Sequence, residues 1–197
     1  MRTQKTQIWP KSCGAATALV TRIELGDNIK LTNEQENLIY TQLKGARGGA
    51  DAFEILPHKI ADYMIASGHN VTILESPATK MMLLPHMPGL KPMYQLYKAG
   101  LHNGIPQERR SAREGDLDNN ARLFLVVRIN GTNLTHYLLA RKDNNTQYIM
   151  NPAPGTDEAI NIPREGDTIK TNVGGHGAGG ERLYTYLGIA IRVWKRP

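Results

Sequence analysis

The chain has 197 residues and a formal net charge of +6, and 40% of its residues are apolar. This length suits a single hydrophobic core, so we expect one domain over residues 1–197. No segment approaches the roughly 20 apolar residues of a membrane-spanning helix, and residues 1–11 lack the apolar part of a secretory signal. These features predict a protein that is cytoplasmic or is exported without a cleaved signal peptide.

Two helices are predicted near the start of the chain, and a third follows a glycine-rich break at 45–49. Residues 14–25 place apolar side chains at helical spacing, and Gly26 follows them as a stop. The segment Thr32–Gln35 is typical of a capping box and so indicates the start of a second helix. The third is predicted from about residue 57 to residue 67, with a proline in its first turn and a glycine after its end.

The remaining regular segments predict strands. Residues 69–74 indicate a short strand, and 123–129, 136–141 and 146–151 indicate an antiparallel meander with turn signals between its strands. A long final strand is predicted at 183–194. Helices followed by an antiparallel sheet define an α+β fold.

Residues 76–122 interrupt this order. Five prolines break the segment, and four of the seven methionines lie in it. We expect an insertion with one short helix near Met93–Ala99. Two interpretations stay open: a lid or partner-facing loop, which the adaptable methionines favour, and an irregular connection without a special role.

Cys13, the only cysteine, lies directly before the first predicted helix. The partial positive charge and unpaired N–H groups of a helix N-terminus lower the pKa of a thiol and bind an oxyanion. This position therefore favours a thiol nucleophile, although a lone cysteine is more often a small buried apolar residue. Gly14 leaves room for a substrate carbonyl, and Gln7, six residues upstream, is a candidate second donor to the oxyanion.

A thiol nucleophile needs a base within hydrogen-bond reach, and the base needs an acceptor that orients it. Among the six histidines, His136 begins a predicted strand that fixes its position, whereas His176 lies in a glycine-rich loop. Asp143 and Asn151 are the candidate acceptors. A turn role explains Asp143, and the returning strand brings Asn151 alongside His136. We therefore predict that Asn151 accepts a hydrogen bond from His136 Nδ1–H, with Asp143 as the alternative.

The phrase Gln-x5-Cys-Gly-Ala-Ala at a helix start resembles the active site of papain-like cysteine peptidases. With His136-Tyr, Tyr148–Pro152 and Ile60–Val71, the chain is similar to the branch that includes bacterial double-glycine leader peptidases. That branch usually has Asp at the position of Asn151, where other papain-like enzymes use Asn. The resemblance implies a papain-like fold. The functional residues that it implies are Cys13 (nucleophile), His136 (base), Asn151 (orienting acceptor) and Gln7 (oxyanion hole).

These residues predict thiol-dependent hydrolysis of an amide bond in a protein or peptide substrate. The same chemistry cleaves a peptide bond or a glutamine side-chain amide, so a peptidase and a protein glutamine deamidase of the bacterial-effector kind stay open. The chain lacks a visible transporter segment, which favours a standalone enzyme or an injected bacterial toxin over a leader peptidase within an exporter. A non-catalytic papain-like binding module is the third alternative.

Other classes of partner are disfavoured. The basic residues are dispersed apart from short clusters within 109–113 and 195–196, and aromatic residues do not alternate with them as in a nucleic-acid-binding surface. The histidines are scattered without the spacing of metal ligands. Residues 174–180 are rich in glycine but lack the Lys-Ser/Thr ending of a phosphate loop. We therefore expect no nucleic-acid partner, no metal and no cofactor.

Overall fold

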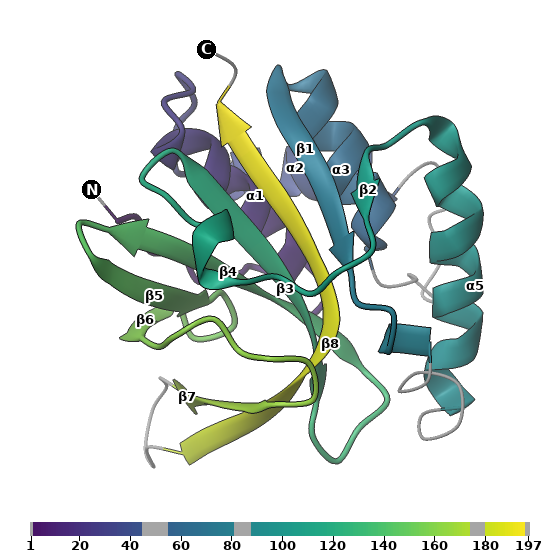
Figure 1. Ribbon diagram of the computed structural model, residues 1–197. Helices are drawn as coiled ribbons and strands as arrows, with labels where there is room; N and C mark the ends of the chain where they lie inside the picture. The colour runs from purple at the N-terminus through teal and green to yellow at the C-terminus, as the bar shows by residue number, and fades with distance from the viewer. Residues whose placement is uncertain (1, 45–54, 81–87, 174–179, 196–197) are drawn as a thin grey trace.

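The structure, a computed structural model, describes residues 2–44, 55–80, 88–173 and 180–195 (Figure 1). In these ranges the chain is an α+β protein whose helices, apart from α5, precede most of the sheet. The α-helices are α1 Cys13–Glu24, α2 Asn33–Lys44, α3 Pro57–Ala66 and α5 Lys91–Gly100. The 3₁₀ turns are η1 Pro88–Leu90, η2 Leu101–Asn103 and η3 Glu114–Asp116.

The three predicted N-terminal helices are confirmed, with their ends within one or two residues of expectation. Gly26 ends α1 with a φ of +93°, in the left-handed region that favours glycine. Thr32 Oγ1 accepts the N–H of Gln35 at 3.2 Å and so caps α2 as its motif predicts. Pro57 opens α3 at a position where its missing N–H costs no helical hydrogen bond.

Within the described ranges, eight strands form one mostly antiparallel sheet with the order β2-β1-β8-β3-β4-β5-β6, and β7 pairs with β8. The predicted meander is β3–β4–β5, and the pairing of β1 with β2 is parallel. Strands β2, β6 and β7 were not predicted. The strands are β1 His69–Glu75, β2 Gln107–Glu108, β3 Ala121–Ile129, β4 Thr135–Asp143, β5 Thr146–Asn151, β6 Thr156–Ala159, β7 Thr168–Val173 and β8 Gly180–Lys195.

Strand β8 changes partner halfway along its length. One edge pairs with β3 from Tyr184 to Trp194, with a register shift next to Gly188, while the other edge pairs first with β7 and then, from Ile189 onward, with β1. Gly188 lies at the change with a φ of +75°, and its carbonyl accepts the N–H of Ser76 at 2.9 Å. A Cβ atom there would lie 2.8 Å from Glu165 Cδ, so both the backbone conformation and the space require glycine.

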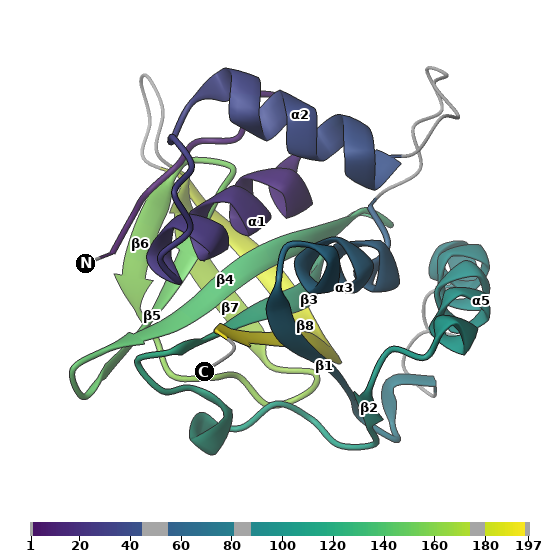
Figure 2. The ribbon, with the colours of Figure 1, turned by 90° about the horizontal axis from the view of Figure 1, so that it is seen from above.

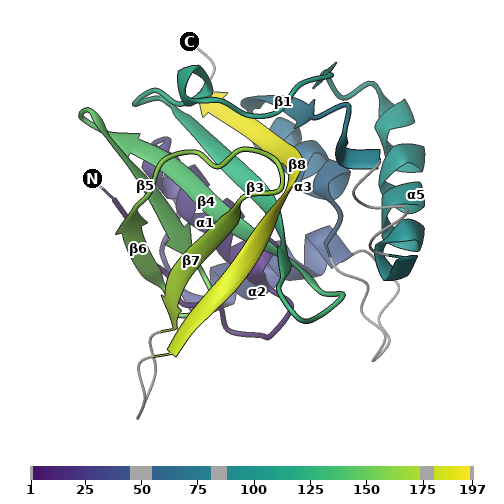
Figure 3. The same ribbon diagram turned by 60° about the horizontal axis from the view of Figure 1, so that its bottom comes forward.

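Each face of the sheet has its own hydrophobic core. Helices α1, α2 and α3 cover one face (Figure 2), where side chains such as Phe124 and Tyr137 pack against them. The neighbouring residues Leu125 and Leu138 point to the opposite face, as the period of two in a strand requires. Strand β7 and the connections around 112–117 and 160–162 close that face (Figure 3).

The segment 76–122 is more regular than its composition predicts. Its expected short helix is present as α5 and is somewhat longer than predicted, and β2 adds a short edge strand beside β1. Tyr97 is fully buried in the helix-side core, so part of this segment belongs to the folded domain. Its role as a lid stays a prediction. The expected break at 45–49, Met81, Met82, Met87 and the loop at 174–179 lie outside the described residues.

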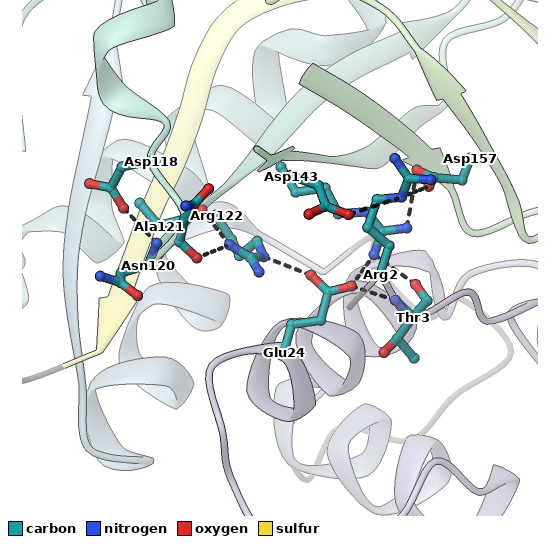
Figure 4. Close-up of polar contacts among 11 residues, drawn as sticks. Arg2, Thr3, Glu24, Asp118, Asn120, Ala121, Arg122, Asp143 and Asp157 are labelled. Atoms are coloured by element: carbon teal, nitrogen blue, oxygen red, sulfur yellow. Dashed lines mark hydrogen bonds and ion pairs between the residues drawn. The ribbon is translucent and has the colours of Figure 1, made fainter. Parts of the chain in front are cut away.

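A buried network of charges fixes the end of α1 (Figure 4). The Glu24 carboxylate accepts hydrogen bonds from Arg122 Nε at 2.6 Å and from the N–H of Thr3 at 2.7 Å. Arg141, which is fully buried, contacts the same carboxylate and lies 3.0 Å from Asp157 Oδ1. These contacts join α1 to β3, β4, β6 and the N-terminal segment, so the helix that begins at Cys13 is held at its other end.

Among the described residues, no helix has the length and apolar content needed to cross a bilayer.

Candidate functional site

Cys13 is the first residue of α1, and a short loop wraps around it. The N–H of Trp9 donates to Ser12 Oγ at 3.0 Å, and the N–H of Ser12 donates back to the carbonyl of Trp9 at 3.1 Å. Cys13 itself is buried, with 7% of its surface exposed. Because the first N–H groups of a helix have no partner within it, this end of α1 directs donors and partial positive charge toward the sulfur.

A buried glutamate on α2 holds this loop in place. Glu36 Oε1 accepts the hydroxyl of Ser12 at 2.6 Å and the N–H of Ile8 at 2.9 Å, and its other oxygen lies 2.7 Å from Lys5 Nζ. The Glu36 carboxylate is fully buried, so these contacts replace the water that a charged group needs. Sequence reasoning missed Glu36, because a glutamate in the first turn of a polar helix usually faces solvent.

Cys13 and His136 line the same small pocket, which has a volume of about 110 Å³. The pocket lies where β3 turns into β4, beneath the loop that precedes α1. Most of the remaining wall is apolar, so a group that enters it meets little competing water. The other lining residues are Pro10, Lys11, Ile55, Ile129, Leu134, Thr135 and Tyr137.

His136 forms a buried hydrogen bond with Asn151, the acceptor favoured by sequence. The two atoms are His136 Nε2 and Asn151 Oδ1, 2.9 Å apart. The prediction that Nδ1 faces Asn151 is therefore wrong, because the orientation of the imidazole ring turns Nε2 toward Asn151. Asn151 Oδ1 also lies 3.0 Å from the backbone nitrogen of Ala153. That N–H can only donate, so this side-chain atom must be the oxygen.

The orientation of Asn151 fixes the tautomer of the imidazole. Since Asn151 Oδ1 accepts, His136 Nε2 must carry the proton, and in the neutral ring Nδ1 is then the nitrogen with a lone pair. On the other side of the amide, Asn151 Nδ2 donates to Thr171 Oγ1 at 2.8 Å and to the hydroxyl of Tyr184 at 2.9 Å. Strands β5, β7 and β8 thus all contribute to holding one histidine on β4.

The environment of His136 keeps its ring neutral at physiological pH. Burial lowers the pKa of His136 to about 4, because the charged ring would lose its hydration. The hydrogen bond to Asn151 opposes this effect, and the positive charge of Arg182 adds to it. A neutral imidazole whose Nδ1 holds a lone pair is chemically a proton acceptor.

Gln7 and Asp143, the other two candidate residues, take no part in the hydrogen bond between His136 and Asn151. Gln7 Nε2 donates to the carbonyl of Trp9 at 2.7 Å, and the backbone N–H of Gln7 donates to the carbonyl of Pro152 at 2.8 Å. Gln7 is not among the residues that line the pocket, so its oxyanion role stays a prediction. Asp143 lies at the other end of β4 from His136, where its carboxylate is 4.0 Å from Arg2 Nε.

The described part of the chain has no group of three or more His, Cys, Asp or Glu residues placed to hold a metal ion. Comparison with known proteins gives no further assignment: neither a protein-family model nor a curated protein sequence matches the chain. What can be inferred about function therefore depends on the geometry around Cys13 and His136.

Proposed function

We propose that the protein is a cysteine-dependent amide hydrolase of the papain-like type, with Cys13 as nucleophile, His136 as base and Asn151 as the residue that orients the base. The observation that supports this most strongly is that one histidine shares a pocket with the only cysteine while its far nitrogen is held by a buried asparagine. A nucleophile, a base and an orienting acceptor in this order are the elements of thiol catalysis.

In the proposed mechanism, His136 Nδ1 removes the proton of the Cys13 thiol, and the sulfur attacks the substrate carbonyl. The N–H of Cys13 at the start of α1 and the side chain of Gln7 stabilise the oxyanion. His136 then protonates the leaving amine, and a C–N bond breaks to leave a thioester. Water, activated by His136, hydrolyses the thioester and restores the thiol.

The dimensions of the pocket favour a single carboxamide side chain over an extended peptide as the group that enters. About 110 Å³ is well below the roughly 300–1,000 Å³ of sites that enclose whole small molecules. This observation favours protein glutamine deamidation as the second candidate, beside peptide cleavage. Both reactions suit a standalone enzyme or a bacterial toxin, and both have a protein or peptide as substrate.

The test has a chemical and a catalytic part. Iodoacetamide should alkylate Cys13 of the folded protein at neutral pH much faster than it alkylates the denatured chain, because a helix N-terminus and a nearby base favour the thiolate. Intact-mass spectrometry of candidate substrates then separates the reactions: replacement of an amide nitrogen by oxygen indicates deamidation, and fragments indicate peptide cleavage.

Cys13→Ala and His136→Ala should abolish turnover, and Asp143→Ala is the matched control because this carboxylate lies at the far end of β4. Alkylation no faster than in the denatured chain would contradict the proposal. Such a result, together with unmodified substrates, would favour the third alternative, a binding module without catalysis.

A further inference from the structure

A second pocket, with a volume of about 510 Å³, lies between the end of β1 and the helix α5. It shares no lining residue with the pocket of Cys13 and His136. Its volume is in the range of sites that bind small molecules. Its charged and polar lining comes from three separate segments, at 75–80, 94–98 and 107–109. The residues that carry the argument are Glu75, Lys80, Tyr94, Lys98, Gln107 and Arg109.

Among the described residues that line this pocket, Glu75 carries the only carboxylate, and both of its oxygens accept hydrogen bonds from protein donors. Its Oε1 accepts the hydroxyl of Tyr94 at 2.6 Å, and its Oε2 accepts Lys98 Nζ at 2.9 Å and a hydrogen bond from Gln107 Nε2. Glu75 is 6% exposed. Glu75 therefore neutralises Lys98, and it makes no ion pair with Lys80 or Arg109.

Lys80 and Arg109 make no ion pair with any residue in the described ranges. Arg110, next in the chain, is different: its guanidinium pairs with both oxygens of Asp116 at 2.6 and 2.7 Å and with Glu108 at 2.6 Å. Burial and Glu75 raise the pKa of Tyr94, whereas the charge of Arg109 lowers it, so the Arg109 guanidinium acts on the hydroxyl inside the pocket. Within the basic cluster of residues 109–113, Arg110 is therefore paired with carboxylates, whereas Arg109 lines the pocket.

We propose that this pocket binds a small dianion, either a phosphate group or a pair of carboxylates. Three cations and one carboxylate leave an excess of two positive charges around the pocket. A phosphate monoester carries about two negative charges near neutral pH, and the planar guanidinium of an arginine binds two oxygens at once. A dianion of this size relieves the mutual repulsion of Lys80, Lys98 and Arg109.

Isothermal titration calorimetry with inorganic phosphate and, separately, with succinate tests this site on the intact protein, at constant ionic strength. We expect saturable binding of at least one of the two dianions to one site. Arg109→Gln and Lys80→Gln should each weaken binding about tenfold, the loss expected for one charge-assisted hydrogen bond. Neither residue makes an ion pair within the described ranges, so both variants should fold normally.

Two controls make the outcome decisive. Lys30→Gln removes one exposed positive charge between α1 and α2, far along the chain from the pocket, and should leave the affinity unchanged. Cys13→Ala should bind as the wild type does, because the two pockets are separate. Binding of phosphate alone assigns the site to phosphate-bearing ligands, and binding of succinate alone assigns it to dicarboxylates. Absence of saturable binding of both, or equal weakening by Lys30→Gln and Arg109→Gln, would overturn the proposal.

Discussion

The imidazole ring of His136 lies against the phenol ring of Tyr184, with 5.4 Å between their centroids and 23° between their planes. The Tyr184 hydroxyl also accepts a hydrogen bond from Asn151 Nδ2. One residue of β8 therefore contacts both partners of the buried hydrogen bond. Because Tyr184 is itself buried, it keeps water away from that bond, and a hydrogen bond shielded in this way is electrostatically stronger than one in water.

Tyr184→Phe should separate the two contacts of this residue. The ring still packs on His136, but one hydrogen of the Asn151 amide loses its acceptor, which should cost about 1–3 kcal/mol of unfolding free energy. If the same change also removes about 1 kcal/mol of transition-state stabilisation, kcat/KM falls roughly fivefold. Urea unfolding and steady-state kinetics measure the two effects. Tyr186→Phe, in a buried tyrosine of the same strand, is the matched control and should leave kcat/KM unchanged.

Asn151→Ala should slow turnover roughly 10- to 1,000-fold, because the imidazole loses the acceptor that fixes its tautomer. Asp143→Ala should change the rate little, since Asp143 lies at the opposite end of β4. Asn151→Asp should retain activity and raise the pKa of His136, because a carboxylate favours the charged ring. A pH–rate profile of the three variants measures this. Severe loss in Asp143→Ala with normal activity in Asn151→Ala would refute the assignment.

The buried, neutral His136 should make the protein less stable in mild acid. An unfolded histidine has a pKa of about 6.5, whereas burial lowers the pKa of His136 to about 4. Between these values the unfolded chain binds a proton that the folded chain does not. The unfolding free energy is therefore fully retained above about pH 6.5 and decreases as the pH falls toward 4, by about 3 kcal/mol.

Urea unfolding of the wild type and of His136→Gln across this pH range isolates the effect. His58 and His69, whose pKa values burial also lowers, contribute equally to both proteins and cancel in the difference. The wild type should lose more stability than the variant on acidification. Parallel stability curves would show that His136 titrates alike in the folded and unfolded chain.

Glu36 should control the reactivity of Cys13 without contacting a substrate. Glu36→Ala leaves the ammonium of Lys5 and the N–H of Ile8 without this acceptor, which should cost about 3–5 kcal/mol of unfolding free energy. Glu36→Gln keeps the shape but not the charge, so it should fold and still slow the alkylation of Cys13 by loosening the loop. Glu34→Ala, in an exposed glutamate of the same turn, should alter neither quantity by a comparable amount. Equal effects at both positions would refute a specific role for Glu36.

Local signals in the sequence were sufficient for most of the elements. Gly26, the capping motif at Thr32 and Pro57 each act through the conformation of one or two residues, so the ends of the helices could be predicted. Apolar segments bounded by turn signals likewise identified β3, β4 and the long final strand. Strand order was not predictable in this way. The position of β8 between β1 and β3 depends on pairing between segments that are distant in the sequence. The periodicity of apolar residues does not show which distant strands will pair.

The hairpin between β4 and β5 brings His136 and Asn151 together, and the sequence predicted both this hairpin and the hydrogen bond between the two side chains. It could not determine which ring nitrogen faces Asn151, because that depends on the side-chain torsion angles and on Ala153 and Tyr184. Glu36 was missed for a similar reason. A buried charge is identified by what surrounds it, and here Lys5, Ile8 and Ser12 come from a different part of the chain.

The position of β8 has a consequence for the order of folding during synthesis. Strands β1 and β3 are neighbours of β8 but not of each other, so the sheet cannot join its two parts until the residues up to about 195 have left the ribosome. Pairing partners so far apart in sequence slow folding, because the chain must close large loops before any contact compensates for the lost entropy. Until then, the apolar side of α3 lacks the part of its covering surface that β8 supplies. We therefore expect the nascent chain to depend on chaperones longer than a protein of similar size with local strand pairing.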